Sequence, residues 1–261
     1  MVDVGPLREF LTVFAFCVVR LTAACVVAPF LAKQVLPGQA RNSLMFAWGL
    51  MIYPMVSPTL DAGLPTGPTL LGLIAKEIFL GILIGFLAAK VFWLAMSVGF
   101  FIDNQRGASM ASVFDPNSGE QTSPLGLLLQ QAIIALFYVS GGLLIFLAGV
   151  FESYRLWPID SFYPTLDAGF PLFVLGVVDD LMRATVVLAA PVVIVMFFTD
   201  FGLGLVNRFA PQLNVFFLSM SVKGVVALAI LVVYLPFLFV YLDREFIDDQ
   251  VLMNFFQGVV S

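Results

Sequence analysis

The sequence predicts an all-helical protein that crosses a membrane several times. Of its 261 residues, 61% are hydrophobic and only 11% are charged. Soluble domains carry roughly 25% charged residues, so this composition cannot supply a soluble surface. The apolar residues also lie in long runs, and about 20 apolar residues are enough for a helix to cross a bilayer. We therefore expect a polytopic fold of helical hairpins, forming a single domain over residues 1–261.

The first three apolar segments differ in length, and this affects how each can meet a bilayer. They cover residues 8–32, 43–57 and 69–102. The first has no convincing signal-peptide cleavage site, so we expect it to remain in the protein. The second is short for a span, whereas the third is long enough to tilt, break or project beyond the membrane.

Three further segments, at residues 124–151, 171–206 and 213–242, complete the predicted fold. Pro191 lies inside the fifth segment, and a proline there removes one helical hydrogen bond and predicts a kink. The last two segments form a predicted C-terminal helical hairpin over 171–242, with a polar tip at 207–214. In the tip, Arg208, Gln212 and Asn214 can satisfy the free ends of the two helices.

The connections between segments predict an orientation. Lys33 and Arg41 lie in the first connection, whereas the second has no Lys or Arg. The positive-inside rule then places the first connection in the cytoplasm and the N-terminus outside. The sequences TLDAGLP (residues 59–65) and TLDAGFP (residues 165–171) echo each other. They are either a pseudo-repeated hairpin or two similar turn sequences, and we assign them no function.

Composition excludes several functional classes. The chain has no histidine, which removes the usual general base and the commonest metal ligand. A net charge of −5 argues against nucleic acid as a partner. Cys17 and Cys25 are eight residues apart on one predicted helix, which is too far for a disulfide. No phosphate-binding glycine loop is present. We therefore expect no catalytic residue, no metal site and no cofactor.

Charged residues interrupt the apolar segments: Arg20, Lys76, Glu77, Lys90, Arg183, Asp200 and Lys223. Each would cost ~2.5–3.5 kcal/mol at the centre of a bilayer, so lipid exposure is disfavoured. They are buried contacts within an assembly, relay or substrate residues of an ion- or solute-coupled transporter, or side chains that snorkel to the interface. The charges are mostly basic, which weakens the transporter alternative. Helical spacing allows Arg183 to pair with Asp179 or Asp180.

The connection over residues 103–123 reads DNQRGASMASVFDPNSGEQTS. Asp103, Asn104, Gln105 and Arg106 gather hydrogen-bonding groups at the end of an apolar helix, and DPNSG is a strong turn signal. Polar irregular backbone beside membrane segments is tolerated where it lines an aqueous cavity or is covered by protein. The segment is therefore a pore-lining or plugging loop, or else an ordinary solvent-exposed loop.

Two motifs resemble a known family. One is the run from Ile102 to Ala108, IDNQRGA, followed by Asp115, Pro116, Gly119 and Ser123. The other is Gly202-Leu203-Gly204-Leu205 followed by RFAPQLNVF at residues 208–216. Together they resemble the type III secretion export-gate subunits called SctT or SpaR, whose flagellar counterpart is FliR. The form of the first motif is closer to the injectisome branch.

The resemblance implies a non-enzymatic subunit of a helical export-gate assembly in the bacterial inner membrane, within the secretion-system basal body. Its expected partners are SctR-, SctS- and SctU-type subunits, unfolded secreted proteins and membrane lipid. It also implies roles for two sets of residues. A loop that plugs the closed pore would contain Asp103, Asn104, Gln105, Arg106, Gly107, Asp115, Pro116, Gly119 and Ser123. A hairpin tip near the cytoplasmic entrance would contain Arg208, Pro211, Gln212 and Asn214.

Overall fold

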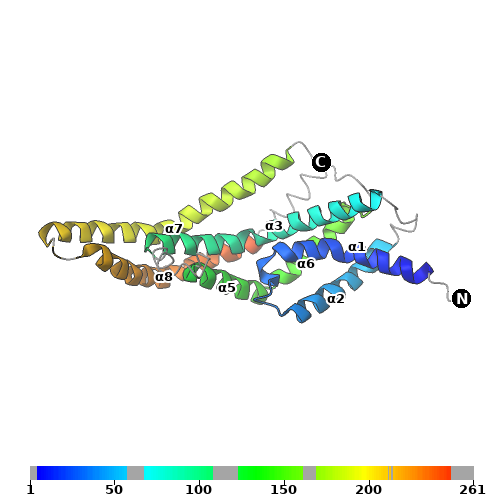
Figure 1. The fold of residues 1–261 in the computed structure, drawn as a ribbon, viewed down its shortest axis with the longest axis horizontal. Helices are drawn as coiled ribbons and strands as arrows, with labels where there is room; N and C mark the ends of the chain where they lie inside the picture. Colours follow the sequence, from blue (N-terminus) through cyan, green and yellow to red (C-terminus); the bar gives the residue numbers. More distant parts are fainter. Residues whose placement is uncertain are drawn as a thin grey trace. The chain divides into compact units, whose positions relative to one another are not determined.

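The computed structural model describes residues 5–57, 68–107, 123–160, 169–210, 212 and 214–247. Most of these residues are helical, and no strand occurs among them, which confirms the predicted all-helical class. The elements are α1 (Gly5–Val27), the 3-10 turn η1 (Pro29–Leu31), α2 (Gly38–Val56), α3 (Pro68–Gln105), α5 (Pro124–Val139), α6 (Gly142–Leu156), α7 (Phe170–Phe209) and α8 (Val215–Ile247) (Figure 1).

Four of the described helices are long and apolar enough to cross a membrane: α1, α3, α7 and α8. The pair α5 and α6 would supply a fifth span if it crosses as one broken unit. The expected uninterrupted segment 124–151 is therefore wrong in one respect, because it divides into two helices. Gly141 lies between them with φ 82°, a left-handed conformation that glycine adopts without steric cost. The chain is a multi-pass membrane protein.

Helix α7 continues through Pro191, which lies near the middle of its range. Figure 1 shows this helix changing direction about half-way along its length. A proline inside a helix lacks the N–H of one backbone hydrogen bond, and its ring crowds the preceding turn. The kink expected from the sequence therefore agrees with the course of the helix.

The described helices fall into two compact units, and α3 and α7 contribute to both. The first unit contains α1, η1, α2, α6, α3 up to Lys90 and the start of α7. In it, α1 and α3 approach closely at Gly81 and Gly85. A Cβ on Gly85 would lie 2.5 Å from the carbonyl oxygen of Ala24, and one on Gly81 would clash with that of Arg20. Two small residues four apart let helix backbones touch in this way.

The second unit contains α3 from Val91, α5, α7 from Leu175, and α8. Helices α3 and α5 meet at Gly99 and Gly126, where a Cβ on Gly99 would clash with the Gly126 backbone. Nearby, the rings of Phe92 and Phe137 pack edge to face with centroids 5.3 Å apart. In the apolar, membrane-spanning stretches of α7 and α8, only 33% and 22% of the residues are buried, against 67% in that of α3. The C-terminal hairpin therefore offers a large apolar surface to lipid or to another protein.

Candidate functional site

A cluster of charges, called here the buried cluster, lies inside the first unit and consists of Arg20, Lys76 and Glu77. The guanidinium of Arg20 binds the Glu77 carboxylate through two nitrogens, with Nε to Oε2 at 2.6 Å and Nη2 to Oε1 at 3.0 Å. The Lys76 ammonium lies 3.0 Å from Oε1 of the same carboxylate. Paired, bidentate geometry of this kind is what an ion pair needs to offset the cost of leaving water.

Two cations share one carboxylate in this cluster, and backbone carbonyls beyond the end of α6 take up the excess positive charge. Arg20 Nη2 donates to the carbonyl of Trp157 at 2.9 Å. Lys76 Nζ donates to the carbonyls of Pro158 and Ile159 at 2.9 and 3.1 Å. These carbonyls lie at the C-cap of α6 and just beyond it, and each accepts a charge-assisted hydrogen bond from a cation. The cluster thereby ties α1 and α3 to the end of α6.

Side chains from α6 complete the enclosure of Arg20. Its Nη1 donates to the hydroxyl of Ser153 at 3.1 Å, and the Tyr154 ring lies beneath its guanidinium, 4.0 Å from Cζ to the ring centroid. The Tyr154 hydroxyl in turn donates to the carbonyl of Cys17 at 2.8 Å. The side chains of Arg20 and Glu77 are 0% exposed. The buried cluster is therefore a structural clamp without access for a substrate.

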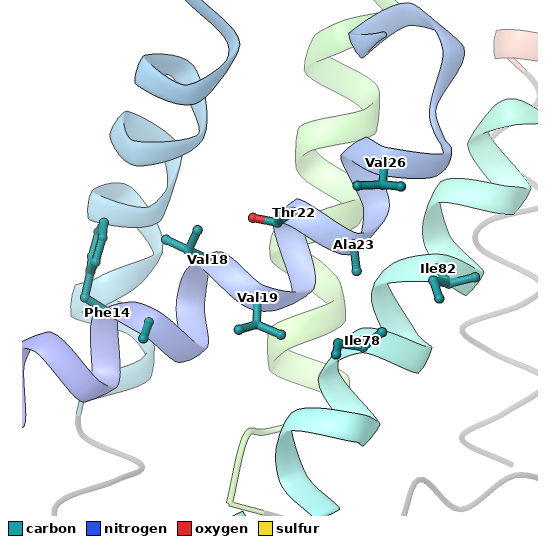
Figure 2. Close-up of a pocket in the computed structure, with 9 residues that line it drawn as sticks. Phe14, Val18, Val19, Thr22, Ala23, Val26, Ile78 and Ile82 are labelled. Carbon is teal, nitrogen blue, oxygen red and sulfur yellow. The ribbon is translucent and has the colours of Figure 1, made fainter. Parts of the chain in front are cut away.

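An apolar groove of about 630 Å³ also lies in the first unit, between α1 and α3. Figure 2 shows Val19, Ala23 and Val26 on α1 facing toward the side on which Ile78 and Ile82 of α3 lie. Thr22 supplies the hydroxyl in the lining, and that hydroxyl lies 3.9 Å from the sulfur of Met45. Such a lining can contact an apolar group, and it offers no carboxylate, amine or thiol.

A second group of polar residues, called here the α3 junction, lies in the second unit around the end of α3 and consists of Asp103, Arg106, Ser123, Asp200 and Lys223. Oδ2 of Asp103 accepts hydrogen bonds from the Ser123 hydroxyl at 2.7 Å and the Leu125 amide at 3.0 Å. Ser123 is the N-cap of α5, and its hydroxyl oxygen accepts from the Gly126 amide at 2.9 Å. Both free amides in this first turn are thus satisfied, and the carboxylate also lies at the positive end of the helix dipole.

The chain leaves α3 through a short, well-defined cap. Arg106 Nη2 lies 2.8 Å from Oδ1 of Asp103, one turn earlier on the chain. Gly107 has φ 86°, and its amide donates to the carbonyl of Asn104 at 3.1 Å. A glycine in the left-handed conformation is the usual way for a helix to end. Because Asp103 holds Ser123, the described residues on either side of 108–122 are fastened to each other.

Helix α8 reaches the same end of α3 through Lys223 and Met220. Lys223 Nζ donates to the carbonyl of Gln105 at 3.2 Å and to Oδ2 of Asp200 at 3.0 Å. Met220 lies beside Gly107, where an added Cβ would be 3.2 Å from its Cε. Three helices, α3, α7 and α8, therefore meet at one lysine, which is partly accessible.

The other residues singled out in the sequence are distributed as follows. Asn104, Arg183, Arg208, Gln212 and Asn214 are exposed, and Lys90 is buried in α3. Helical spacing allows Arg183 to pair with Asp179 or Asp180, but among the described residues no ion pair joins these exposed side chains. Outside the described residues lie Asp115, Pro116, Gly119, Pro211 and most of both TLDAG sequences.

Among the residues that the structure describes, no group of three Cys, Asp or Glu side chains could hold a metal ion. The geometry does not identify the protein's family, but comparison with known proteins does. Residues 11–248 match the family of bacterial export proteins, family 1.

The chain belongs to this family.

Relatives of this bacterial export protein extend over most of its length. It is 43% identical to Yop proteins translocation protein T of Yersinia pestis over 230 residues, 87% of each chain. It is 33% identical to surface presentation of antigens protein SpaR of Salmonella typhimurium, covering 79% of this chain and 76% of that one. It is 27% identical to flagellar biosynthetic protein FliR of Bacillus subtilis, covering 94% and 92%. These matches confirm the resemblance seen in the sequence, and they support a type III secretion export apparatus protein over a solute transporter.

Several residues of this export protein escaped sequence reasoning. Ser153, Tyr154 and the carbonyl of Trp157 surround Arg20, and Met220 lies against Gly107. None of these residues is charged, so they could not be found as charges that interrupt an apolar segment, which is how Arg20 and Lys223 were found. The sequence offered one signal for Ser153 and Tyr154: they are polar residues just after the fourth apolar segment, where a helix end needs hydrogen-bonding partners.

Proposed function

We propose that this export protein joins SctR- and SctS-type partners to form the pore through which unfolded proteins cross the bacterial inner membrane. In this proposal the pore lies within the basal body of the secretion system, and the segment over 103–123 plugs it when it is closed. An SctU-type subunit contacts the hairpin tip at the cytoplasmic entrance. Family membership and the names of the relatives support the general role.

The observation that carries the plug proposal is the bond between Asp103 and Ser123. It joins the described residues on either side of 108–122 to each other within the second unit, through a buried carboxylate. A loop that must block a pore needs anchors that hold under load, and a buried charged hydrogen bond contributes more than an exposed one. The same carboxylate accepts from the Leu125 amide, so the anchor also caps α5.

The test shortens the loop and leaves its anchors intact. A variant lacking residues 110–120 keeps Asp103, Arg106, Gly107 and Ser123, and should assemble normally while the membrane becomes permeable to ions. Ion flux into vesicles or cells containing the complete apparatus measures this. Normal assembly with unchanged permeability would contradict the plug.

The partner proposal has a separate test. The protein should be extracted by detergent in a complex with SctR- and SctS-type subunits, at one copy per complex. Mass measurement of the intact complex gives both composition and stoichiometry. A stable monomer under mild extraction would argue against the proposed assembly.

A further inference from the structure

We propose that Lys223 is a positioning residue, through which the α7–α8 hairpin holds the C-terminal end of α3 in place. Lys223, Asp200 and Gln105 all belong to the second unit. Its consequence for the channel rests on the proposed function, since the end of α3 leads into the segment proposed as a plug.

The contacts of Lys223 are suited to this role. Its ammonium binds the carbonyl of Gln105, the last residue of α3, and the carboxylate of Asp200 on α7. A cation near the last carbonyls of a helix is favoured by the helix dipole. The Asp200 carboxylate orients the lysine and balances its charge, so a single side chain joins three helices.

A second contact from α8 reaches Gly107, two residues beyond the end of α3. Met220 lies three residues before Lys223 on α8, so both face the same side of that helix. Met220 packs at Gly107, where φ is 86° and a side chain would be strained. Helix α8 thus contacts the last residue of α3 by charge and Gly107, just beyond the helix, by packing.

Exposure indicates that this link can open. The side chains of Asp200 and Lys223 are 36% and 12% exposed, whereas those of Arg20 and Glu77 are fully enclosed. A partly hydrated ion pair has a smaller net energy than an enclosed one, since water competes for both charges. The hairpin is also the least buried part of the described spans, so a partner that moves it would act directly on Lys223.

The experiment measures hydrogen–deuterium exchange in the intact complex for wild type, Lys223→Met and Asp200→Asn. Loss of the lysine should speed exchange of the amides at 102–107 about tenfold, because local opening free energies set exchange rates. Amides at 91–98 of the same helix should not change, which separates a local positioning role from general destabilisation. Lys223→Arg keeps a cation on α8 and should restore slow exchange.

Asp179→Asn is the matched control, because Asp179 also lies on α7 and has no ion pair among the described residues. Should Lys223→Met fail to accumulate, Asp200→Asn carries the test, since it changes only the charge of one carboxylate. Unchanged exchange at 102–107 in these variants would overturn the inference.

Ion permeability is measured on the same samples. A leak that accompanies faster exchange supports both the positioning role and the plug. Faster exchange without a leak supports the positioning role of Lys223 and contradicts the plug, so the two proposals fail separately.

Discussion

The buried cluster and the α3 junction each provide partners for a basic residue that lies within an apolar helix, but they do so in two different ways. In both, a basic residue within an apolar helix binds backbone carbonyls at or just beyond the end of another helix and pairs with a carboxylate. The cluster excludes water completely, with Arg20 and Glu77 enclosed by three helices. The junction leaves Asp200 and Arg106 partly hydrated.

The difference teaches what each site can do. An enclosed ion pair cannot be separated without leaving a bare charge in a low-dielectric interior, which makes it a permanent connection. A partly hydrated pair can exchange its partner for water at low cost, so it can take part in a conformational change. We therefore expect substitutions in the cluster to affect assembly, and substitutions in the junction to affect gating.

The largest effect is expected for Glu77→Gln. It leaves Arg20 and Lys76 without their carboxylate, and breaking a buried pair typically costs about 3–5 kcal/mol. The protein should fail to accumulate in the membrane, as measured by immunoblot of membrane fractions. Glu152→Gln is the control, because Glu152 is in the same unit and pairs with exposed Arg155 at 3.4 Å. Normal accumulation of Glu77→Gln would contradict the role of the cluster as a clamp.

A smaller effect is expected for Gly81→Ala, which tests the packing that brings the cluster together. An added methyl group would meet the backbone of α1, and overpacking of this kind costs about 1–3 kcal/mol. The unfolding temperature of the purified complex should fall. Gly204→Ala, where the added carbon meets nothing within 4 Å, should leave that temperature unchanged or raise it. Equal effects of the two substitutions would refute a close approach of α1 and α3.

At the α3 junction, Ser123→Ala removes the N-cap of α5 and one partner of Asp103. Loss of such a cap costs about 1 kcal/mol, so the protein should still assemble. Ion permeability of the resting apparatus should nevertheless rise, because the anchor at the end of the loop is weakened. Ser140→Ala, at the C-terminal end of α5, is the control. A large loss of assembly with no change in permeability would contradict the expectation that the α3 junction affects gating and the buried cluster affects assembly.

The smallest effect is expected for Arg155→Gln. Exposed ion pairs contribute roughly 0–1 kcal/mol, and this pair lies outside both sites. Unfolding temperature, assembly and permeability should match wild type within error. A clear defect would indicate that the exposed surface of α6 contacts another subunit of the apparatus.

Much of the fold could be predicted because hydrophobicity and length constrain membrane helices strongly. The six apolar segments correspond to described helices, with the fourth divided at Gly141. That division was missed because the segment is apolar on both sides of it, and hydropathy does not report a local backbone conformation. Arg20, Glu77 and Lys223 were identified as unusual because an isolated charge in an apolar run is costly.

The sequence by itself determined that these charges must have partners, since lipid cannot solvate them. Only the tertiary structure decided which partners, because Arg20 and Glu77 are far apart in the chain and many helix packings would satisfy hydropathy. It also decided that backbone carbonyls beyond α6 and at the end of α3 serve as partners, and backbone groups have no sequence signature. Finally, it distinguished the enclosed pair of Arg20 and Glu77 from the partly exposed pair of Lys223 and Asp200, because burial depends on every helix packed around a side chain.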